Sequence, residues 1–440
     1  MAIIHQFTFF DPDDLLSDLG DLKRLQLVLH NLPDEPLVSA MEAVRGKTGR
    51  NDYPVRMMWN LFIAGIIFQH PSAASLLREL SRNHQLRWVV SDGHMTAATI
   101  PSEDAMSRFG KRLMEHQPLI DAMFAEVVDC LRAYVPEFGK RVAIDSKMIQ
   151  SAARKRSSAS HLDGRGEHDA DWCAKRYAGV KEDGTAWEKT TWYFGYKLHL
   201  LVDSQYEIPL AYHVTTARPH DLPEGKKLMN AYAETNPELH AACGILTADR
   251  GYDSKAWADE LAQAGITAVI DTKHMWHDSE KPLLDYENLT YNEKGEVTCC
   301  CPVSGEVRTM SHNGYEAGRD CIRKQCPMVA YKGMICQGQA HCRARTGVRI
   351  PLSFDSRIFT PIPRDTRKWK QEYKRRTAVE RVNSRFDVSY GFEHHGIRGL
   401  KKMTLRTSLA LLVMVTKALE HVKRTPIHEG EYNRLVKMPA

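Results

Sequence analysis

The sequence contains no hydrophobic run long enough to cross a bilayer. The longest apolar stretch near the C-terminus, residues 409–415, has seven residues, whereas a membrane-spanning helix needs about 20. The first residues lack a basic segment followed by a long apolar one, which is the pattern of a secretory leader. Internal repeats and low-complexity tracts are also absent, which excludes a repeat solenoid. We therefore expect a cytoplasmic globular protein.

Net positive charge is confined to one part of the chain. Between Arg364 and Arg406, thirteen Lys or Arg residues stand against five Asp or Glu residues, a net charge of +8, so the remaining 397 residues sum to −3. Such a field attracts a polyanion. The alternative is a solvated helix face with ion pairs between residues four apart. The chain of 440 residues, 43% of them hydrophobic, is large enough for two or three domains with true cores.

Residues 1–138 have the pattern of helices. Residues 56–68 are apolar over several turns and follow Pro54, while Ser72 and Ser102 stand after prolines where N-caps are expected. Two interpretations fit this region, a DNA-binding helical domain and a purely structural bundle. The cations that would serve the first are Arg78, Arg82, Arg87, Arg108, Lys111 and Arg112.

From residue 139 to residue 274 the pattern changes to strands alternating with helices. The expected strands cover residues 142–149, 191–202, 208–215, 244–249 and 267–270. The expected helices begin at Asp221, as N-cap, and at residue 254. This order predicts an α/β fold, a mixed sheet with helices on its faces. The polar residues 151–190 are interpreted as a long loop between the first two strands.

Three acidic residues have the local sequence that a two-metal phosphodiester-cleaving site needs. Asp145 and Asp249 follow apolar runs as if ending buried strands, and Glu380 lies in the basic segment. Together they would hold two divalent ions through oxygen ligands and stabilise the attacking and leaving oxygens of a displacement at phosphorus. The alternatives are a turn or edge position for Asp145 and a helix cap for Asp249.

The segment around Glu380 carries a more specific pattern. Tyr373, Arg376 and Glu380 are three and four residues apart, a spacing that predicts one shared helix face. A metal-binding carboxylate, a guanidinium for phosphate and a phenol for DNA would meet the substrate together there. The alternative is an intrahelical Arg376–Glu380 ion pair. His199 and His213 are expected to be core groups, and His220 a neighbour of the site.

Seven of the ten cysteines lie in residues 275–365, an expected insertion before the Glu380 segment. Clustered cysteines in a cytosolic protein favour metal binding over disulfides. The spacings are looser than C-x2-C, so a structural Zn²⁺ and unligated thiols remain alternatives. The candidate ligands are Cys301, Cys321, Cys326, Cys336 and Cys342, of which four would suffice.

In this order along the chain, the residues resemble the DDE transposases encoded by bacterial insertion sequences. The matching stretches are residues 56–58, 77–80, 101–109, 143–146, 195–199, 220–221, 248–252 and the Y-x2-R-x3-E signature of Tyr373, Arg376 and Glu380. The resemblance implies a ribonuclease-H-like catalytic domain in which Asp145, Asp249 and Glu380 are the catalytic residues and bind Mg²⁺ or Mn²⁺. The resemblance covers roughly residues 50–420. Together with the pattern along the chain it predicts a helical domain (1–138), a catalytic domain in two parts (139–274 and 366–424), the insertion (275–365) and a tail (425–440).

The same resemblance implies an activity and partners. The enzyme would hydrolyse DNA at the ends of its mobile element and join the freed 3′-hydroxyl to target DNA. Its partners would be double-stranded DNA, namely terminal inverted repeats and target, and a second copy of the chain in a homodimer on paired ends. When bound to DNA it would be associated with the nucleoid. Two alternatives are a ribonuclease-H-like DNA nuclease without strand transfer and a domesticated DNA-binding derivative, although the latter would have lost a carboxylate.

One position departs from the family signature. A lysine usually follows the glutamate by seven residues, and Asp387 stands there in this chain. The DNA contact of that lysine must therefore come from Arg381, Arg385 or elsewhere. The residues expected to contact DNA are Tyr373, Lys374, Arg375, Arg376, Arg381 and Arg385.

Overall fold

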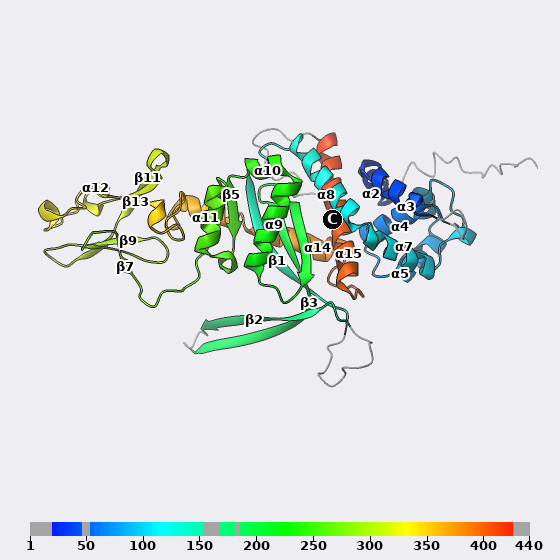
Figure 1. Cartoon of the computed structure of the whole chain (residues 1–440), viewed down its shortest axis with the longest axis horizontal. Coiled ribbons are helices and arrows are strands. Elements are labelled where there is room, and N and C mark those ends of the chain that lie inside the picture. Colours follow the sequence, from blue (N-terminus) through cyan, green and yellow to red (C-terminus); the bar gives the residue numbers. More distant parts are fainter. Residues whose placement is uncertain (1–19, 46–52, 154–166, 181–184, 426–440) are drawn as a thin grey trace, which may run out of the picture.

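The computed structural model describes residues 20–45, 53–153, 167–180 and 185–425. The chain forms an elongated molecule with the N-terminal helices at one end, the main sheet in the middle and the expected insertion at the other end (Figure 1). Part of the expected loop over residues 151–190 and most of the tail from residue 425 lie outside the described residues.

The N-terminal region is helical, as the sequence predicts. Pro54 precedes the apolar helix α4, and the side chains of Ser72 and Ser102 cap α5 and α7 by accepting backbone N–H bonds of 3.2 Å each. Capping of this kind satisfies donors that a helix start leaves unpaired. The helices are α2 (Leu22–Asn31), α3 (Glu35–Ala43), α4 (Val55–Ile67), α5 (Ala73–Arg82), α6 (His84–Ser91), α7 (Glu103–Glu115) and α8 (Gln117–Arg132).

The C-terminal helix α15 (Leu400–Arg424) joins this helical region to the sheet. It packs against α2, α4 and α8 on one side and against β4 on the other. A single hydrophobic cluster therefore runs from the N-terminal helices into the sheet, so the two regions share a core. No helix within residues 20–45, 53–153, 167–180 and 185–425 is long and apolar enough to span a membrane.

The central sheet is mixed, and its strands run in the order β4-β3-β1-β5-β6. β1 pairs antiparallel with β3 and parallel with β5, and β6 extends the parallel part. This confirms the predicted ribonuclease-H-like sheet. The strands are β1 (Arg141–Gln150), β3 (Ala186–Asp203), β4 (Ile208–Thr216), β5 (Ile245–Ala248) and β6 (Thr267–Ile270).

Helices cover both faces of this sheet. α9 (Asp221–Thr235) and α14 (Thr377–Tyr390) both contact β1 and β3, from opposite faces (Figure 1). α11 (Lys255–Gln263) and α13 (Arg367–Lys374) pack near β6, and the short α10 (Pro237–Ala242) follows α9. The sheet's central strand is thus buried between helices, which is the setting that the apolar sequence before Asp145 requires.

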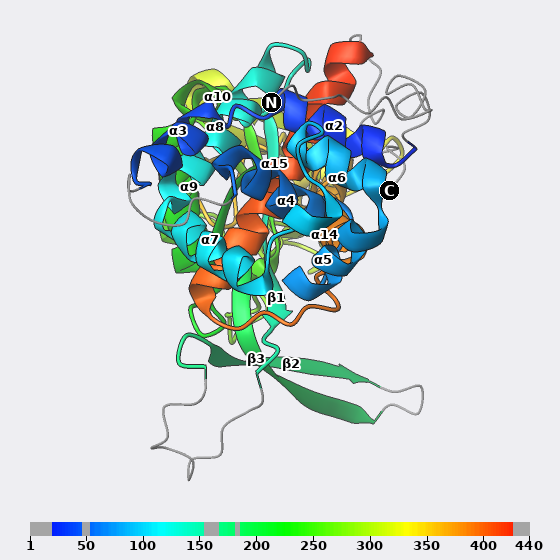
Figure 2. The same cartoon turned by 90° about the vertical axis from the view of Figure 1, so that its right-hand side faces the viewer.

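Residues 151–190 are not simply a loop, and that expectation is wrong for the described part. Residues 171–180 form the strand β2 (Asp171–Val180), which pairs along its length with the first half of β3. The two strands project from the body as a ribbon (Figure 2). Gly195 marks where β3 leaves the ribbon for the sheet, since a Cβ there would lie 2.2 Å from the Ile149 carbonyl oxygen. The sequence of mixed charge did not indicate this strand, because the described ribbon residues are exposed or half-buried and no buried face gives an alternating pattern.

The expected insertion between β6 and α13 is a separate small structure. Its hydrophobic cluster is distinct from the main core. One sheet contains β7 (Lys281–Pro282), β8 (Leu289–Tyr291), β9 (Val297–Cys300) and β10 (Val307–Thr309). The other contains β11 (Ser311–Glu316), β12 (Cys321–Gln325) and β13 (Val348–Pro351), with the short helix α12 (Pro327–Ala330) between the last two.

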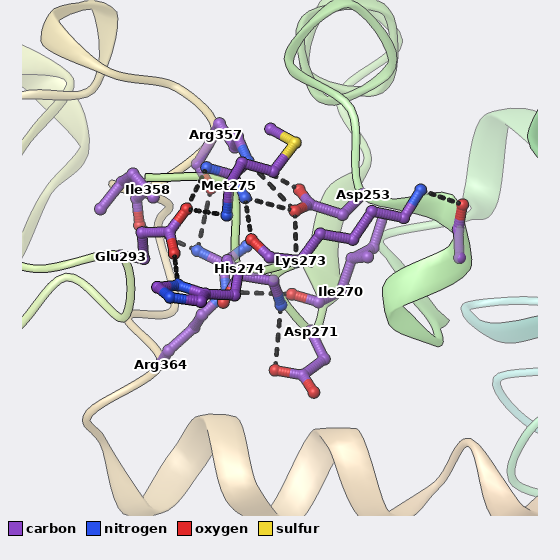
Figure 3. Close-up of polar contacts among 12 residues, drawn as sticks. Asp253, Ile270, Asp271, Lys273, His274, Met275, Glu293, Arg357, Ile358 and Arg364 are labelled. Carbon is purple, nitrogen blue, oxygen red and sulfur yellow. Dashed lines mark hydrogen bonds and ion pairs between the residues drawn. The ribbon is translucent and has the colours of Figure 1, made fainter. Parts of the chain in front are cut away.

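A buried polar network fixes the insertion to the part of the chain that carries β5 and β6 (Figure 3). Arg357 donates to Asp253 at 2.7 Å, and both side chains are at most 7% exposed. Arg357 also donates to the Lys273 carbonyl, and Lys273 Nζ reaches the Gly251 carbonyl at 3.0 Å. Arg364 adds a bond to the Ile270 carbonyl at the end of β6. The network therefore ties the insertion to the turn that follows Asp249.

Candidate active site

Asp145 and Asp249 come from neighbouring parallel strands. Ile144 of β1 pairs with Ala248 of β5, so the next residue on each strand, Asp145 or Asp249, lies at the same edge of that pairing. Asp145 does not end its strand as expected, because β1 continues to Gln150 through its pairing with β3. It lies where the pairing with the shorter β5 stops. The sheet register alone therefore brings the two carboxylates together.

Asp249 also serves as a helix cap. Its Oδ1 accepts the backbone N–H of Gly251 at 2.8 Å at the start of the 3-10 helix Arg250–Tyr252. The cap interpretation of the sequence is correct, and it does not compete with a role at the sheet edge, because one carboxylate oxygen remains for another partner.

The charge of Asp145 is only partly compensated. Its side chain is 21% exposed. Burial above all, and then the Asp249 carboxylate, raise the pKa of Asp145 to about 6, against a backbone hydrogen bond from Ser146 and the positive charge of Arg376. A divalent cation at this edge would relieve the repulsion, and carboxylate oxygens are the ligands that Mg²⁺ and Mn²⁺ prefer. The donors thus fit the ions that the sequence predicts.

Arg376 lies between Asp145 and Glu380. Its Nη2 donates to Glu380 Oε1 at 2.7 Å, and its Nη1 is 3.6 Å from Asp145 Oδ2. Glu380 is 50% exposed. Among the residues that the structure describes, no three or more His, Cys, Asp or Glu side chains are already arranged as ligands around one point. The guanidinium is therefore the cation that links the two carboxylates here.

Tyr373, Arg376 and Glu380 do not share one helix, and that expectation is wrong. α13 ends at Lys374 and α14 begins at Thr377. Between them, the N–H groups of Arg375 and Arg376 bond to carbonyls three residues back. The tight turn breaks the 3.6-residue period on which the spacing argument depended. The groups stay close, since the guanidinium of Arg376 is 5.9 Å from the Tyr373 ring, which stacks on Trp369.

The structure adds two residues to the candidate site, Asp221 and Lys197. Lys197 is 4% exposed, and its Nζ donates to Asp221 Oδ1 at 2.9 Å and to the Pro219 carbonyl at 2.7 Å. Burial acts to raise the pKa of Asp221, but the hydrogen bond and charge of Lys197 hold it below its ordinary value. Asp221 contributes to the raised pKa of Asp145. Both residues lie in stretches that match the family, 195–199 and 220–221, and this match was the only indication in the sequence that they belong to the site.

The histidines near the sheet contact neighbouring side chains or cap a helix. His199 is fully buried, burial lowers its pKa to about 4, and its Nε2 lies 3.2 Å from Thr215 Oγ1. His213 Nε2 lies 3.4 Å from Glu224. His220, and not Asp221 as expected, is the N-cap of α9, because Asp221 already has helical geometry.

Two of the expected DNA-contacting arginines are engaged within the protein. Arg381 and Arg385 both form ion pairs with Glu207, which is 3% exposed and has a positive φ of 55° in the turn between β3 and β4. These pairs hold α14 on the sheet. Asp387, where the family signature has lysine, pairs with Lys147 of β1. A lysine is thus present near that position but comes from the strand that carries Asp145.

One of the expected cations of the helical region, Lys111, lines a cleft. The cleft has a volume of about 520 Å³, lies among α4, α5, α7 and α15, and is lined by Lys111, Arg398, Lys402 and Arg406 among others. Arg87 has a structural place instead, because it is buried and donates to the Leu80 carbonyl. Lys374 is exposed, and Arg375 Nε lies 3.2 Å from Glu372.

The cysteines of the insertion divide into two sets. Cys301, Cys326, Cys336 and Cys342 line one small cavity, together with Cys299, which the sequence argument left out. Cys321 does not line it, and its thiol contacts Glu316. The clustering in sequence could not separate these sets, since Cys321, which begins β12, lies only five residues before Cys326, which precedes α12.

The strand order defines a ribonuclease-H-like domain with a helical N-terminal extension, and two aspartates lie at one edge of its sheet. The chain belongs to the family described as "Transposase DDE domain", whose family model matches residues 136–416. A second model, "Transposase domain (DUF772)", matches residues 12–112 in the helical region. The protein is therefore a DDE transposase by family, and members of this family are enzymes that act on DNA.

Other comparisons are more distant. No curated protein matches the chain. Among solved structures, the piggyBac transposase in a synaptic complex with hairpin DNA is 12% identical over 93% of this chain and 83% of that chain. Its TM-score is 0.29, too low to inform any detail of this site.

Replacing Asp145 by Asn should stabilise the metal-free protein at pH 8. A folded-state pKa of about 6 against an ordinary 3.8 means that the folded protein binds the proton more tightly. The stabilisation from this tighter proton binding is fully present below the ordinary pKa of 3.8. It is lost as the pH rises through the folded-state pKa. The Asn variant escapes the loss, so its free energy of unfolding at pH 8 should be higher by about 1–3 kcal/mol. The difference should vanish below about pH 4.

Chemical unfolding in EDTA at the two pH values measures this difference. A variant less stable than the wild type at pH 8 would contradict the assignment of Asp145 as an uncompensated carboxylate.

Proposed function

We propose that this enzyme cuts DNA at the ends of its own mobile element and transfers the freed 3′-hydroxyl to target DNA. The observation that carries the proposal is the register of β1 and β5, which places Asp145 and Asp249 at one sheet edge in a chain of the DDE transposase family. Glu380 is linked to the same edge through Arg376.

Asp145, Asp249 and Glu380 are the proposed ligands of two Mg²⁺ or Mn²⁺ ions. When bound, such ions stabilise the attacking and leaving oxygens of an in-line displacement at phosphorus. The nucleophile is water in the first step and the 3′-hydroxyl in the second, so the protein forms no covalent bond to DNA. A structural zinc ion in the insertion is a separate proposal.

Arg376 has two proposed states. In the structure its guanidinium pairs with Glu380 and compensates part of the charge of Asp145. Both carboxylates are free for a common ion only when this side chain turns away. Its bidentate fork then suits a phosphate of the DNA, with Tyr373 beside it as a hydrogen-bond donor. Arg376 would thus leave the carboxylates of Asp145 and Glu380 and bind a DNA phosphate when DNA and metal ions enter the site.

The DNA partners are the terminal inverted repeats and the target duplex, engaged by a homodimer on paired ends. The cleft lined by Lys111 and Lys402 brings cations from the helical region and from α15 onto one surface, as backbone contacts require. A place of action on cytoplasmic, nucleoid-associated DNA follows from these partners.

A cleavage assay tests the proposal. The substrate is DNA carrying the inverted repeats that flank the gene, with Mg²⁺, and a scrambled-end duplex is the control. We expect cleavage at the repeat ends only. Cleavage of both duplexes alike would favour the rival ribonuclease-H-like nuclease, and DNA binding without cleavage would favour the domesticated derivative.

Binding of end DNA should depend on salt through the cleft cations. In the variant Lys111→Ala with Lys402→Ala, we expect weaker binding and a slope of log affinity against log salt that is smaller by about 2, because two phosphate contacts are lost. The charge-matched control is Lys255→Ala with Lys332→Ala, whose exposed lysines lie on α11 and in the insertion. Equal slopes in the two variants would show that the cleft lysines do not contact the DNA.

A further inference from the structure

The insertion has only a small hydrophobic core of its own. Its own cluster contains eleven buried residues, spread over two sheets of short strands. A metal ion or disulfides can add to the stability of a structure with so few buried residues. All ten cysteines of the chain are free thiols in the structure.

Five cysteines line one cavity in the insertion, although no three His, Cys, Asp or Glu side chains among the described residues already stand as ligands around one point. Cysteines 299, 301, 326, 336 and 342 line a space of about 30 Å³, and the sulfur atoms of Cys301 and Cys336 are 3.5 Å apart. Cys300 also borders the space, but it is exposed and its thiol faces the Gly305 carbonyl at 3.5 Å. A space of this size holds a single small particle such as a water molecule or an ion. An organic ligand does not fit.

The turn after β9 presents the Cys301 sulfur to this cavity. The backbone N–H of Ser304 donates to Cys301 Sγ at 3.4 Å, and the N–H of Gly305 donates to the Cys301 carbonyl at 2.8 Å. Gly305 has a φ of +72°, which glycine adopts without strain. An N–H directed at sulfur favours a thiolate, the form of cysteine that binds metals.

Four of the five cysteines stand where the backbone can adjust. Cys301 follows β9, Cys326 precedes α12, and Cys336 and Cys342 flank the 3-10 helix Gln339–His341. Cys299 instead lies within β9 and is paired on both sides, with Leu289 of β8 and Arg308 of β10. Tetrahedral zinc requires four sulfurs at about 2.3 Å, which turns can supply more readily than a strand fixed on both edges.

We propose that Cys301, Cys326, Cys336 and Cys342 bind one structural zinc ion, with Cys299 as an unligated neighbour. Four thiolates and no open position make this a closed, non-catalytic site. The ion would join the β9–β10 turn to the two loops that lead into and out of α12. The proposal does not rest on the proposed function, because no residue of the catalytic edge takes part.

The zinc content of the full-length protein, purified without chelators, tests the proposal. We expect about one zinc per chain. The double variant Cys301→Ser with Cys336→Ser should lose zinc by at least about tenfold, while Cys321→Ser and Cys130→Ser should retain it, since these thiols lie outside the cavity. A wild type without zinc, or a double variant that keeps it, overturns the proposal.

Cobalt substitution guards against a variant that merely misfolds. Co²⁺ bound to the wild type should show the sulfur-to-metal charge-transfer absorption that only thiolate ligands give, and Asp145→Asn should keep it. Absence of that absorption, or a Cys301–Cys336 disulfide found by thiol counting, overturns the zinc site. A protein that holds zinc but fails to cut DNA leaves this inference standing and contradicts only the proposed function.

Discussion

Replacing Asp249 by Asn should lower the rate of Mg²⁺-dependent end cleavage by about 10³-fold or more, because a lost metal-binding charge removes several kcal/mol of transition-state stabilisation. The fold should survive, since the amide oxygen of Asn can still accept the Gly251 N–H bond that the carboxylate accepts now. Asp145→Asn and Glu380→Gln should behave similarly. The rate is measured on end DNA under single-turnover conditions.

Asp278→Asn is the matched control, because it removes an equal charge from an exposed position in the insertion. We expect it to cleave like the wild type. If Asp249→Asn retained the wild-type rate, the catalytic edge would have been assigned to the wrong residues, whatever the family of the chain.

The largest expected effect on stability comes from Arg357. Substitution by Met leaves the Asp253 carboxylate buried without its partner, and such a loss costs about 3–5 kcal/mol. Both side chains are nearly inaccessible, and Arg357 also bonds to Glu293 and to the Lys273 carbonyl. Calorimetry of the full chain should show a lowered midpoint in the transition that includes the insertion.

Arg343→Met provides the comparison. Arg343 also pairs with an aspartate, Asp285, but the two side chains are 65% and 74% exposed. Solvent screens such pairs, so the change should stay within about 0.5 kcal/mol. The double variant Arg357→Met with Asp253→Asn should recover part of the loss, because it no longer buries an unpaired charge. Equal midpoints for Arg357→Met and Arg343→Met would show that the network of Figure 3 does not hold the insertion.

Much of the sheet could be predicted because its signals are local. The run before Asp145 is apolar since β1 is covered on both faces, and residues 267–270 were expected as a strand and form β6 with the same bounds. The caps Ser72 and Ser102 have short-range partners three residues away. Periodicity and capping are properties of neighbouring residues, so one sequence suffices to find them.

The features that sequence could not give depend on distant residues. The β2–β3 ribbon mixes polar residues with exposed aromatic ones such as Trp187 and Trp192, so no regular alternation indicated it. The break between α13 and α14 occurs within a segment of good helix formers, and nothing local distinguishes it from a continuous helix. Glu207 forms ion pairs with Arg381 and Arg385, which lie more than 170 positions away in the sequence. Such pairings follow from the packing of α14 on the sheet, which spacing alone does not determine.

The cysteines illustrate the same limit. Cys299, which was not among the expected ligands, lines the cavity, whereas the expected Cys321 does not. The two residues lie on strands of different sheets, and their positions depend on strand pairing. Asp221 and Lys197 joined the candidate site for a similar reason. Their pair is only part-buried, and it forms because β3 meets the start of α9.

Strand transfer is the measurement that tests the account most directly. The protein is incubated with Mg²⁺, pre-cleaved element ends that carry a labelled free 3′-hydroxyl, and a target plasmid. The account predicts labelled ends joined covalently to the target, with the product absent when Asp145, Asp249 or Glu380 is replaced by its amide. Efficient end cleavage without any joined product would contradict it and leave a nuclease in its place.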